Sequence, residues 1–186
     1  MSRMEIPDPW RRLFGVNAPR RVVYDEEEVA RRVREMGARI TEHYAGREPI
    51  LVLGLLKGSF IFLADLVREI RVPVHVDFIV ASSYGAERAS SGEVKFLYDP
   101  GVRIQGRDIV LVEDIVDSGA TMDRLVPILE EREPKSLEIC ALLHKRKTAL
   151  VKEPRWVGFD APGDFLVGYG LDHAEDFRHL PFIGAL

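Results

Sequence analysis

The stretch IVLVEDIVDSGAT, residues 109–121, constrains the fold of this chain more than any other segment. Its first four residues, Ile109 to Val112, are β-branched or leucine, which is typical of a short central strand covered on both faces of a parallel sheet. Two acids, Glu113 and Asp114, follow at the expected carboxyl end of that strand, where open α/β sheets bind their ligands. The segment therefore predicts an α/β fold with a ligand site at this strand end.

The end of the same stretch predicts a turn that opens into a helix. Backbone N–H groups at a helix N-terminus bind anions, and small residues after Asp117 let a ligand come close to the backbone. These small residues are Ser118, Gly119, Ala120 and Thr121. Acids beside an anion site would repel the anion, unless they hold sugar hydroxyls or a metal ion while the backbone holds a phosphate. The pattern points to a phosphorylated sugar, with Mg²⁺ as the expected metal.

Elsewhere, strands alternate with helices, which predicts a mainly parallel sheet flanked by helices. Residues 1–19 hold three prolines and are expected to form an irregular lead-in. An amphipathic helix is expected over residues 26–45, and Asp25 followed by Glu28 gives it a capping-box-like start. The single cysteine, Cys140, lies in a predicted strand and is expected to be a buried small side chain.

Three further segments each allow two interpretations. The turn Lys57-Gly58-Ser59 follows a second buried strand and suits a pyrophosphate, although an ordinary turn with a solvated lysine is the alternative. The polar residues 82–93 are either a plain hairpin tip, which the residues alone favour, or a lid. The basic run His144 to Lys147 is either a solvated face or a ligand contact at a strand end.

Composition excludes several classes of protein. The net charge of -4 does not suggest a broad nucleic-acid surface, and no apolar run approaches the roughly 20 residues of a membrane span. Residues 1–10 lack the pattern of a signal peptide, and a single cysteine fits a reducing compartment. We therefore expect a cytoplasmic protein with small-molecule partners, and neither nucleic acid nor membrane as a partner.

Together these residues resemble the type I phosphoribosyltransferases, specifically the hypoxanthine-guanine phosphoribosyltransferase family. Residues 110–121 match that family's signature for 5-phosphoribosyl 1-pyrophosphate, and the resemblance runs from about Val22 to the C-terminus. It implies the type I phosphoribosyltransferase fold, with a core of about residues 26–150 and a small hood of about residues 1–25 and 151–186. Four further segments agree with the family, namely Leu56–Ser59, Ser83–Gly85, Leu143–Arg146, and Phe165–Asp172 with Phe177–Arg178.

The resemblance implies roles at the sugar and the phosphate. Glu113 and Asp114 would hold the ribose hydroxyls and help to hold the metal. The loop from Asp117 to Thr121 would wrap the 5′-phosphate, and Asp117, near purine N7, would be the general base.

It also implies roles at the purine. Lys145 would donate to the 6-oxo group, Phe165 would stack on the ring, and the Leu166 backbone would bind the base edge. His173 stands where the family often has an aromatic residue, which is either a packing variant or a change in base preference.

The leaving group and the lid complete the implied site. Asp172 would bind Mg²⁺, and Arg178, with Lys57 and Gly58, would bind pyrophosphate. The Leu56–Lys57 peptide would be cis. Ser83 and Tyr84 would close over the site, which reverses the preference for a plain hairpin tip.

The implied activity is purine salvage by a Mg²⁺-dependent glycosyltransferase of the pentosyltransferase class. It would transfer the phosphoribosyl group to hypoxanthine, and to guanine, giving IMP or GMP and pyrophosphate. The alternatives are a xanthine-preferring or pyrimidine transferase, and an RNA-binding regulator on the same fold. Members of the family are usually dimers or tetramers, so a homodimer or homotetramer is expected.

Overall fold

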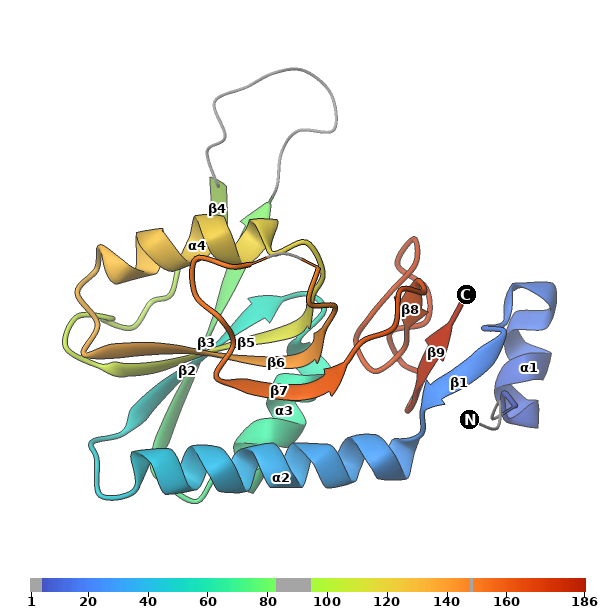
Figure 1. The fold of residues 1–186 in the computed structure, drawn as a ribbon, viewed down its shortest axis with the longest axis horizontal. Coiled ribbons are helices and arrows are strands. Elements are labelled where there is room, and N and C mark those ends of the chain that lie inside the picture. The colour runs from blue at the N-terminus through green and yellow to red at the C-terminus, as the bar shows by residue number, and fades with distance from the viewer. Residues whose placement is uncertain (1–4, 83–94, 148) are drawn as a thin grey trace.

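A computed structural model describes residues 5–82, 95–147 and 149–186, which form two sheets with helices around the larger one (Figure 1). The larger sheet has the strand order β4-β3-β2-β5-β6-β7. Every neighbouring pair in it is parallel except β3 with β4. Its strands are β2 (Ile50–Leu56), β3 (Val74–Ser82), β4 (Lys95–Tyr98), β5 (Asp108–Val116), β6 (Ser136–His144) and β7 (Trp156–Asp160). The predicted mainly parallel sheet is confirmed.

The central strand β5 lies between β2 and β6, and its apolar run is fully buried. Leu51 pairs with Ile109, and Val112 pairs with Cys140, so the three strands run in register to the same edge of the sheet. Ile109 to Val112 are 0% exposed, as expected for a strand covered on both faces. Cys140 is also buried, as predicted, and burial raises the pKa of its thiol above the usual range.

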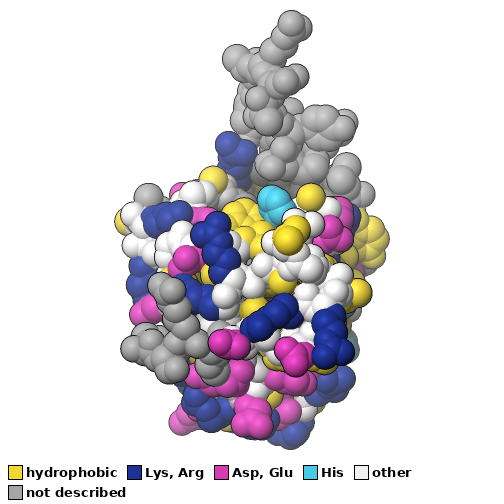
Figure 2. Space-filling view, turned by 90° about the vertical axis from the view of Figure 1, so that its right-hand side faces the viewer, with side chains coloured by type: hydrophobic (Ala, Val, Ile, Leu, Met, Phe, Trp, Pro, Cys, Tyr) yellow, Lys and Arg dark blue, Asp and Glu magenta, His cyan; other side chains and the backbone are white. Residues whose placement is uncertain are grey.

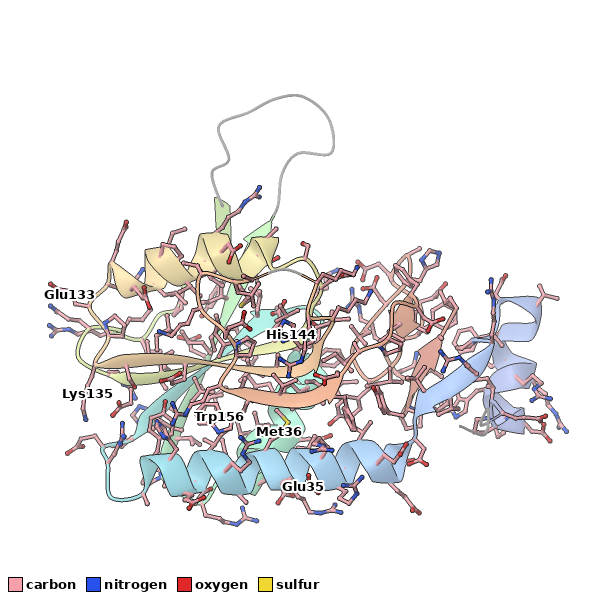
Figure 3. The ribbon with its side chains drawn as sticks, in the orientation of Figure 1. Glu35, Met36, Glu133, Lys135, His144 and Trp156 are labelled. Atoms are coloured by element: carbon pink, nitrogen blue, oxygen red, sulfur yellow. The ribbon has the colours of Figure 1, made fainter. Side chains whose placement is uncertain are left out.

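Helices cover both faces of this sheet, with α2 and α3 on one face and α4 on the other (Figure 1). In α2 the predicted capping box is present, because Asp25 accepts from the Glu28 N–H and Glu28 accepts from the Asp25 N–H. Figure 3 shows Met36 on the side of α2 that faces the sheet and Glu35 on the opposite side. The helices are α1 (Asp8–Phe14), α2 (Glu26–Tyr44), α3 (Phe60–Glu69) and α4 (Ala120–Glu130), with a short 3₁₀ helix η1 (Gly15–Asn17).

The smaller sheet forms a hood beside the carboxyl edge of the larger one. Its strand order is β1-β9-β8, and both pairs are antiparallel. The expected boundary at residue 150 assigned residues 156–160 to the hood, but β7 pairs in parallel with β6 and so belongs to the larger sheet. The hood strands are β1 (Arg21–Tyr24), β8 (Leu166–Val167) and β9 (Ile183–Ala185).

The N-terminal lead-in is helical where an irregular segment was expected. Pro7 is the N-cap residue of α1 and Pro9 lies in its first turn, where a proline leaves no hydrogen bond unmade. Trp10 and Phe14 then pack on the hood, and the ring centres of Phe14 and Phe177 are 4.5 Å apart. The prolines therefore start this helix, and contact with the hood holds it. Among the described residues, no helix is long and apolar enough to span a membrane.

Candidate active site

The carboxyl ends of β2 and β5 meet the hood at one glycine, Gly58. A Cβ atom at Gly58 would lie 1.8 Å from Oδ2 of Asp114. A Cβ atom at Gly170, which has a φ of +101°, would lie 2.1 Å from the Gly58 carbonyl oxygen. Only glycine allows both close approaches. The turn after β2, the acid pair of β5 and the hood are thus in direct contact, and the Leu56–Lys57 peptide in this turn is cis, as the resemblance implied.

In the acid pair of β5, the Glu113 side chain is buried and Asp114 is partly exposed. Glu113 is 9% exposed, and burial with the nearby Asp114 charge raises the pKa of its carboxyl well above the usual range. Burial also raises the pKa of Asp114 to about 6, even though its Oδ1 accepts a 2.9 Å hydrogen bond from the Ile115 N–H. The ionised pair therefore needs a partner that brings hydroxyl donors or positive charge.

The loop after β5 forms a small hollow at the N-terminus of α4. Gly119 is the N-cap residue with a left-handed φ of 79°, and the Ser118 hydroxyl accepts from the Ala120 N–H at 3.4 Å. The residues of this loop, with Glu113 and Met122, line a cavity of about 90 Å³. N–H groups at a helix N-terminus suit a phosphate, and the phosphate site stays a prediction.

Asp117, at the edge of that hollow, is held by two lysines from the end of β6. Lys145 Nζ donates to Oδ2 at 2.9 Å, and Lys147 Nζ donates to Oδ1 at 2.5 Å. Hydrogen bonds from the two ammonium groups hold the pKa of Asp117 below its usual range, and Lys147 has the larger effect. The Lys145 side chain is only 8% exposed, whereas Lys147 is half exposed. The basic run thus reaches Asp117 through Lys145 and Lys147, and a ligand contact for Lys145 stays a prediction.

In the hood, Asp172 and Arg178 form one ionic group with Glu175 and Lys57. Arg178 Nη2 lies 2.8 Å from Asp172 Oδ1 and 3.3 Å from Glu175 Oε2. Asp172 Oδ2 accepts from the Glu175 N–H at 2.9 Å. Lys57 Nζ donates to both carboxylate oxygens of Glu175, at 3.0 and 3.1 Å. The predicted pyrophosphate ligands Lys57 and Arg178 are therefore brought together, although they are far apart in the chain.

The predicted purine platform, Phe165, lies against His173, the residue that follows Asp172. Phe165 is 54% exposed, and its ring meets the His173 ring edge-on, with centres 5.3 Å apart. Leu166 is buried in β8. In the described part of the chain no hydrogen bond or ring contact joins Phe165 to Lys145. The two predicted purine contacts come from different sheets and leave an exposed aromatic face free for stacking.

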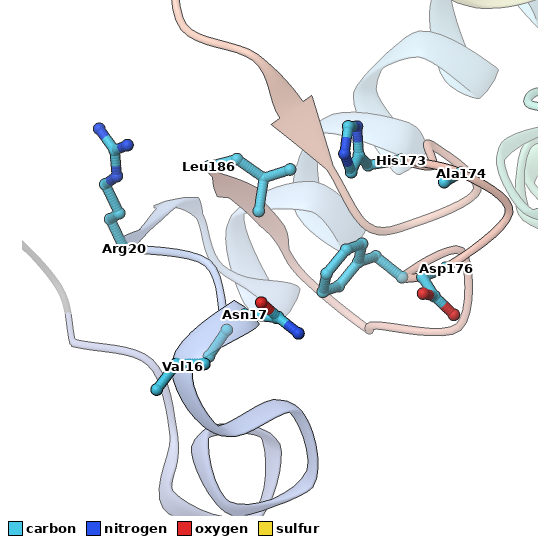
Figure 4. Close-up of a pocket in the computed structure, with 9 residues that line it drawn as sticks. Val16, Asn17, Arg20, His173, Ala174, Asp176 and Leu186 are labelled. Carbon is cyan, nitrogen blue, oxygen red and sulfur yellow. The ribbon is translucent and has the colours of Figure 1, made fainter.

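Most predicted site residues therefore gather at the carboxyl edge of the larger sheet. Two residues that pair with them were not predicted as site residues. Lys147 was noted only as part of a basic run, and Glu175 was not singled out from the sequence. Ser83 and Tyr84, the predicted lid residues, lie outside the described residues. A larger cavity of about 430 Å³ lies elsewhere, between residues 16–20 and the hood turn (Figure 4).

Comparison with known proteins agrees with this geometry. The phosphoribosyl transferase domain family matches residues 21–174, and the chain belongs to that family. Within it, the chain is 49% identical to a hypoxanthine phosphoribosyltransferase of Salmonella typhimurium over 166 residues, which are 88% of this chain and 93% of that protein. It is 44% identical to a hypoxanthine-guanine phosphoribosyltransferase of Dictyostelium discoideum, over 90% of this chain and 95% of that protein.

A solved structure gives the same result. The hypoxanthine-guanine phosphoribosyltransferase of Bacillus anthracis superposes with a TM-score of 0.83 at 42% identity, over 90% of this chain and 99% of that one. The expected resemblance to the hypoxanthine-guanine branch, and the expected fold, are thereby confirmed.

Proposed function

We propose that this protein transfers the 5-phosphoribosyl group of 5-phosphoribosyl 1-pyrophosphate to hypoxanthine, and to guanine, and releases pyrophosphate. The observation that carries the proposal is the ion pair between Asp117 and Lys145. It joins the expected phosphate loop of β5 to the expected purine contact of β6. A sugar phosphate held by the loop and a base held by the lysine would therefore meet at Asp117.

The sugar phosphate would lie along the loop after β5. The backbone N–H groups of residues 118–121 would bind the 5′-phosphate at the N-terminus of α4. Glu113 and Asp114 would accept hydrogen bonds from the ribose hydroxyls, which would satisfy one buried and one partly exposed carboxylate. This division of roles removes the conflict between acids and an anion in one segment.

The base would lie between the sheet edge and the hood. Lys145 would turn from Asp117 to the 6-oxo group, because an ammonium group is a donor only and the oxo group is an acceptor. Phe165 would stack on the ring, and the Leu166 backbone would bind the base edge. A 6-amino purine would present donors to Lys145, so the site favours a 6-oxopurine.

The leaving group would bind between the turn after β2 and the hood. Lys57, the backbone of Gly58, and Arg178 supply positive charge and N–H donors at one place. These groups would neutralise the charge that develops on the departing pyrophosphate.

The acids at this edge fit a magnesium ion. Mg²⁺ binds one or two carboxylates together with substrate phosphates, rather than a cage made wholly of protein. Within the described residues, no group of three or more His, Cys, Asp or Glu side chains is placed to hold a metal. Asp172 would hold it, with Glu113 and Asp114 nearby. When bound, Mg²⁺ supplies charge neutralisation at the pyrophosphate.

The reaction would exchange one bond at ribose C1 for another. The C1–oxygen bond to pyrophosphate breaks as the purine N9 forms its bond to C1, and the oxygen keeps the bonding electrons. Asp117 would accept the proton from purine N7, so the product base is neutral. Exclusion of water by the predicted lid residues Ser83 and Tyr84 would prevent hydrolysis of the sugar.

The RNA-binding alternative gains no support from the hood face of the molecule. Figure 2 shows Lys and Arg interspersed with Asp and Glu on this face, where an RNA surface would need clustered basic residues. The xanthine and pyrimidine alternatives differ only in the base that Lys145, Phe165 and Leu166 accept.

Incubating the purified protein with 5-phosphoribosyl 1-pyrophosphate, Mg²⁺ and one base at a time tests the proposal. We expect nucleotide from hypoxanthine and guanine, little from xanthine, and none from adenine or uracil. Absence of nucleotide with both hypoxanthine and guanine would overturn it. A homodimer or homotetramer, and a cytoplasmic location, stay predictions. Light scattering after size exclusion, and cell fractionation, test them.

A further inference from the structure

The cations assigned to pyrophosphate are both bound to one carboxylate of the protein itself. Glu175 accepts from Lys57 Nζ through both oxygens, and its Oε2 lies 3.3 Å from Arg178 Nη2. These two ion pairs join residues from the turn after β2 and from the hood. A carboxylate between an ammonium group and a guanidinium group makes the contacts that a phosphate oxygen would make.

The backbone around Glu175 is held in this position by further contacts. Ala174 and Glu175 have positive φ values of 53° and 70°, which is uncommon for residues other than glycine. The Glu175 N–H donates to Asp172 Oδ2 at 2.9 Å, and His173 and Asp176 exchange backbone hydrogen bonds across the turn. The turn therefore directs the Glu175 side chain toward Lys57 and Arg178.

The Glu175 carboxylate is exposed to water, so a ligand can replace it on both cations. The Arg178 side chain is only 19% exposed, and its closer pair with Asp172 can stay in place when Glu175 leaves. The side chains of Lys57 and Glu175 are 65% and 66% exposed. Exposed pairs contribute little to stability, and salt screens them. The hydrogen bonds and charges of Lys57, and then of Arg178, lower the pKa of the Glu175 carboxyl.

We propose that Glu175 is an internal competitor of pyrophosphate, which occupies Lys57 and Arg178 until the pyrophosphate group of the substrate displaces it. This inference rests on the proposed function. Its consequence is that Glu175 weakens the binding of both the substrate and the released pyrophosphate. Return of Glu175 to the two cations would then help the product to leave.

The opposite role is physically possible and makes the opposite prediction. If Glu175 positions Lys57 and Arg178 for their ligand, its removal weakens pyrophosphate binding. If Glu175 neither competes with pyrophosphate nor positions the two cations, its removal does not change pyrophosphate binding.

The test is the affinity of inorganic pyrophosphate, measured by calorimetry with Mg²⁺ present, for the wild type and for Glu175→Gln. Glutamine keeps the size of the side chain and removes its charge. We expect the Kd of pyrophosphate to fall about two- to fivefold in Glu175→Gln, and the difference to shrink as salt increases. The KM for 5-phosphoribosyl 1-pyrophosphate should fall with it, while the KM for hypoxanthine stays the same.

Asp176→Asn is the matched control. It removes one negative charge from the same turn, but Asp176 lines the cavity beside Asn17 (Figure 4), and in the described part of the chain no ion pair joins it to Lys57 or Arg178. Its pyrophosphate affinity should equal that of the wild type. An unchanged or raised Kd in Glu175→Gln, or an equal fall in Asp176→Asn, would overturn the inference. A wild-type protein that neither binds pyrophosphate nor forms IMP would instead overturn the proposed function.

Discussion

Lys145 donates to Asp117 across 2.9 Å, so the residue expected to bind the purine is paired with the residue expected to deprotonate it. In the proposed function the pair couples the two ends of the reaction, because Lys145 would turn from Asp117 to the 6-oxo group when the base binds. Its departure would remove one of the two positive charges that depress the pKa of Asp117. Binding of the base would thus prepare Asp117 to accept a proton.

Asp117→Asn tests the role of the base. Asparagine keeps the shape of the side chain but cannot accept the N7 proton, so kcat should fall about 10²- to 10⁴-fold. The KM for 5-phosphoribosyl 1-pyrophosphate should change little. The control is Asp160→Asn, since Asp160 pairs with Arg146 of the same basic run. Steady-state kinetics with hypoxanthine give the answer, and an unchanged kcat would remove Asp117 from the role of base.

Lys145→Ala tests the purine contact. Loss of a hydrogen bond from a charged donor should raise the KM for hypoxanthine about tenfold or more and affect 5-phosphoribosyl 1-pyrophosphate less. Lys147→Ala is the matched control, because Lys147 contacts the same carboxylate of Asp117 but has no predicted purine contact. Equal increases in both KM values for Lys145→Ala would show that the assignment is wrong.

Much of the fold was predictable because it depends on local patterns. The run Ile109–Val112 is apolar on both faces of the strand. The capping box of α2 depends only on Asp25 and Glu28, which lie within four consecutive residues. The helix α1 was missed because its stability comes from Trp10 and Phe14 packing on the distant hood, while its prolines suggested irregular structure. The place of β7 was missed because strand pairing is a tertiary property that a short apolar run does not specify.

The site was predictable where its residues belong to motifs of a known family, which lie at strand ends and in turns. The resemblance gave Lys57, Arg178 and Asp172 without saying what they contact in the free protein. Lys57 and Glu175 are 118 positions apart, and no periodicity or spacing joins them. Such ion pairs between segments follow from the folded arrangement and could only be found there.

The raised pKa of Asp114 predicts a pH-dependent stability. Its folded-state pKa, raised from 3.8 to about 6, means that the folded protein binds more protons than the unfolded chain between these values. The stability that Asp114 contributes is therefore present at low pH and is lost as the pH rises through about 6. Lowering the pH from 8 to 5 should stabilise the wild type by about 1.4 kcal/mol relative to Asp114→Asn.

Urea unfolding of the two proteins at several pH values, without ligand, measures that difference. Each protein also contains acids with lowered pKa values, such as Asp117 and Asp108, whose effect is the reverse. These acids are common to both proteins, so their effect cancels in the comparison. The Glu113 carboxyl, whose pKa the Asp114 charge helps to raise, responds to the substitution and is part of the measured difference. Parallel curves for the wild type and Asp114→Asn would contradict the buried environment of Asp114.

Asp172→Ala tests the proposed magnesium site. Without this carboxylate, the Mg²⁺ concentration for half-maximal rate should rise, because fewer protein ligands hold the metal with the substrate. Asp176→Asn is again the matched control, since it changes an acid of the same turn. A metal titration identical to that of the wild type would count against Asp172 as a ligand.

The most direct measurement of the central claim is a crystal structure with IMP bound. We predict that Lys145 Nζ has left Asp117 and donates to the purine 6-oxo group, that Asp117 lies beside N7, and that Phe165 stacks on the base. The phosphate would lie on the backbone of residues 118–121. A nucleotide bound elsewhere, with the Asp117–Lys145 pair intact, would contradict the account.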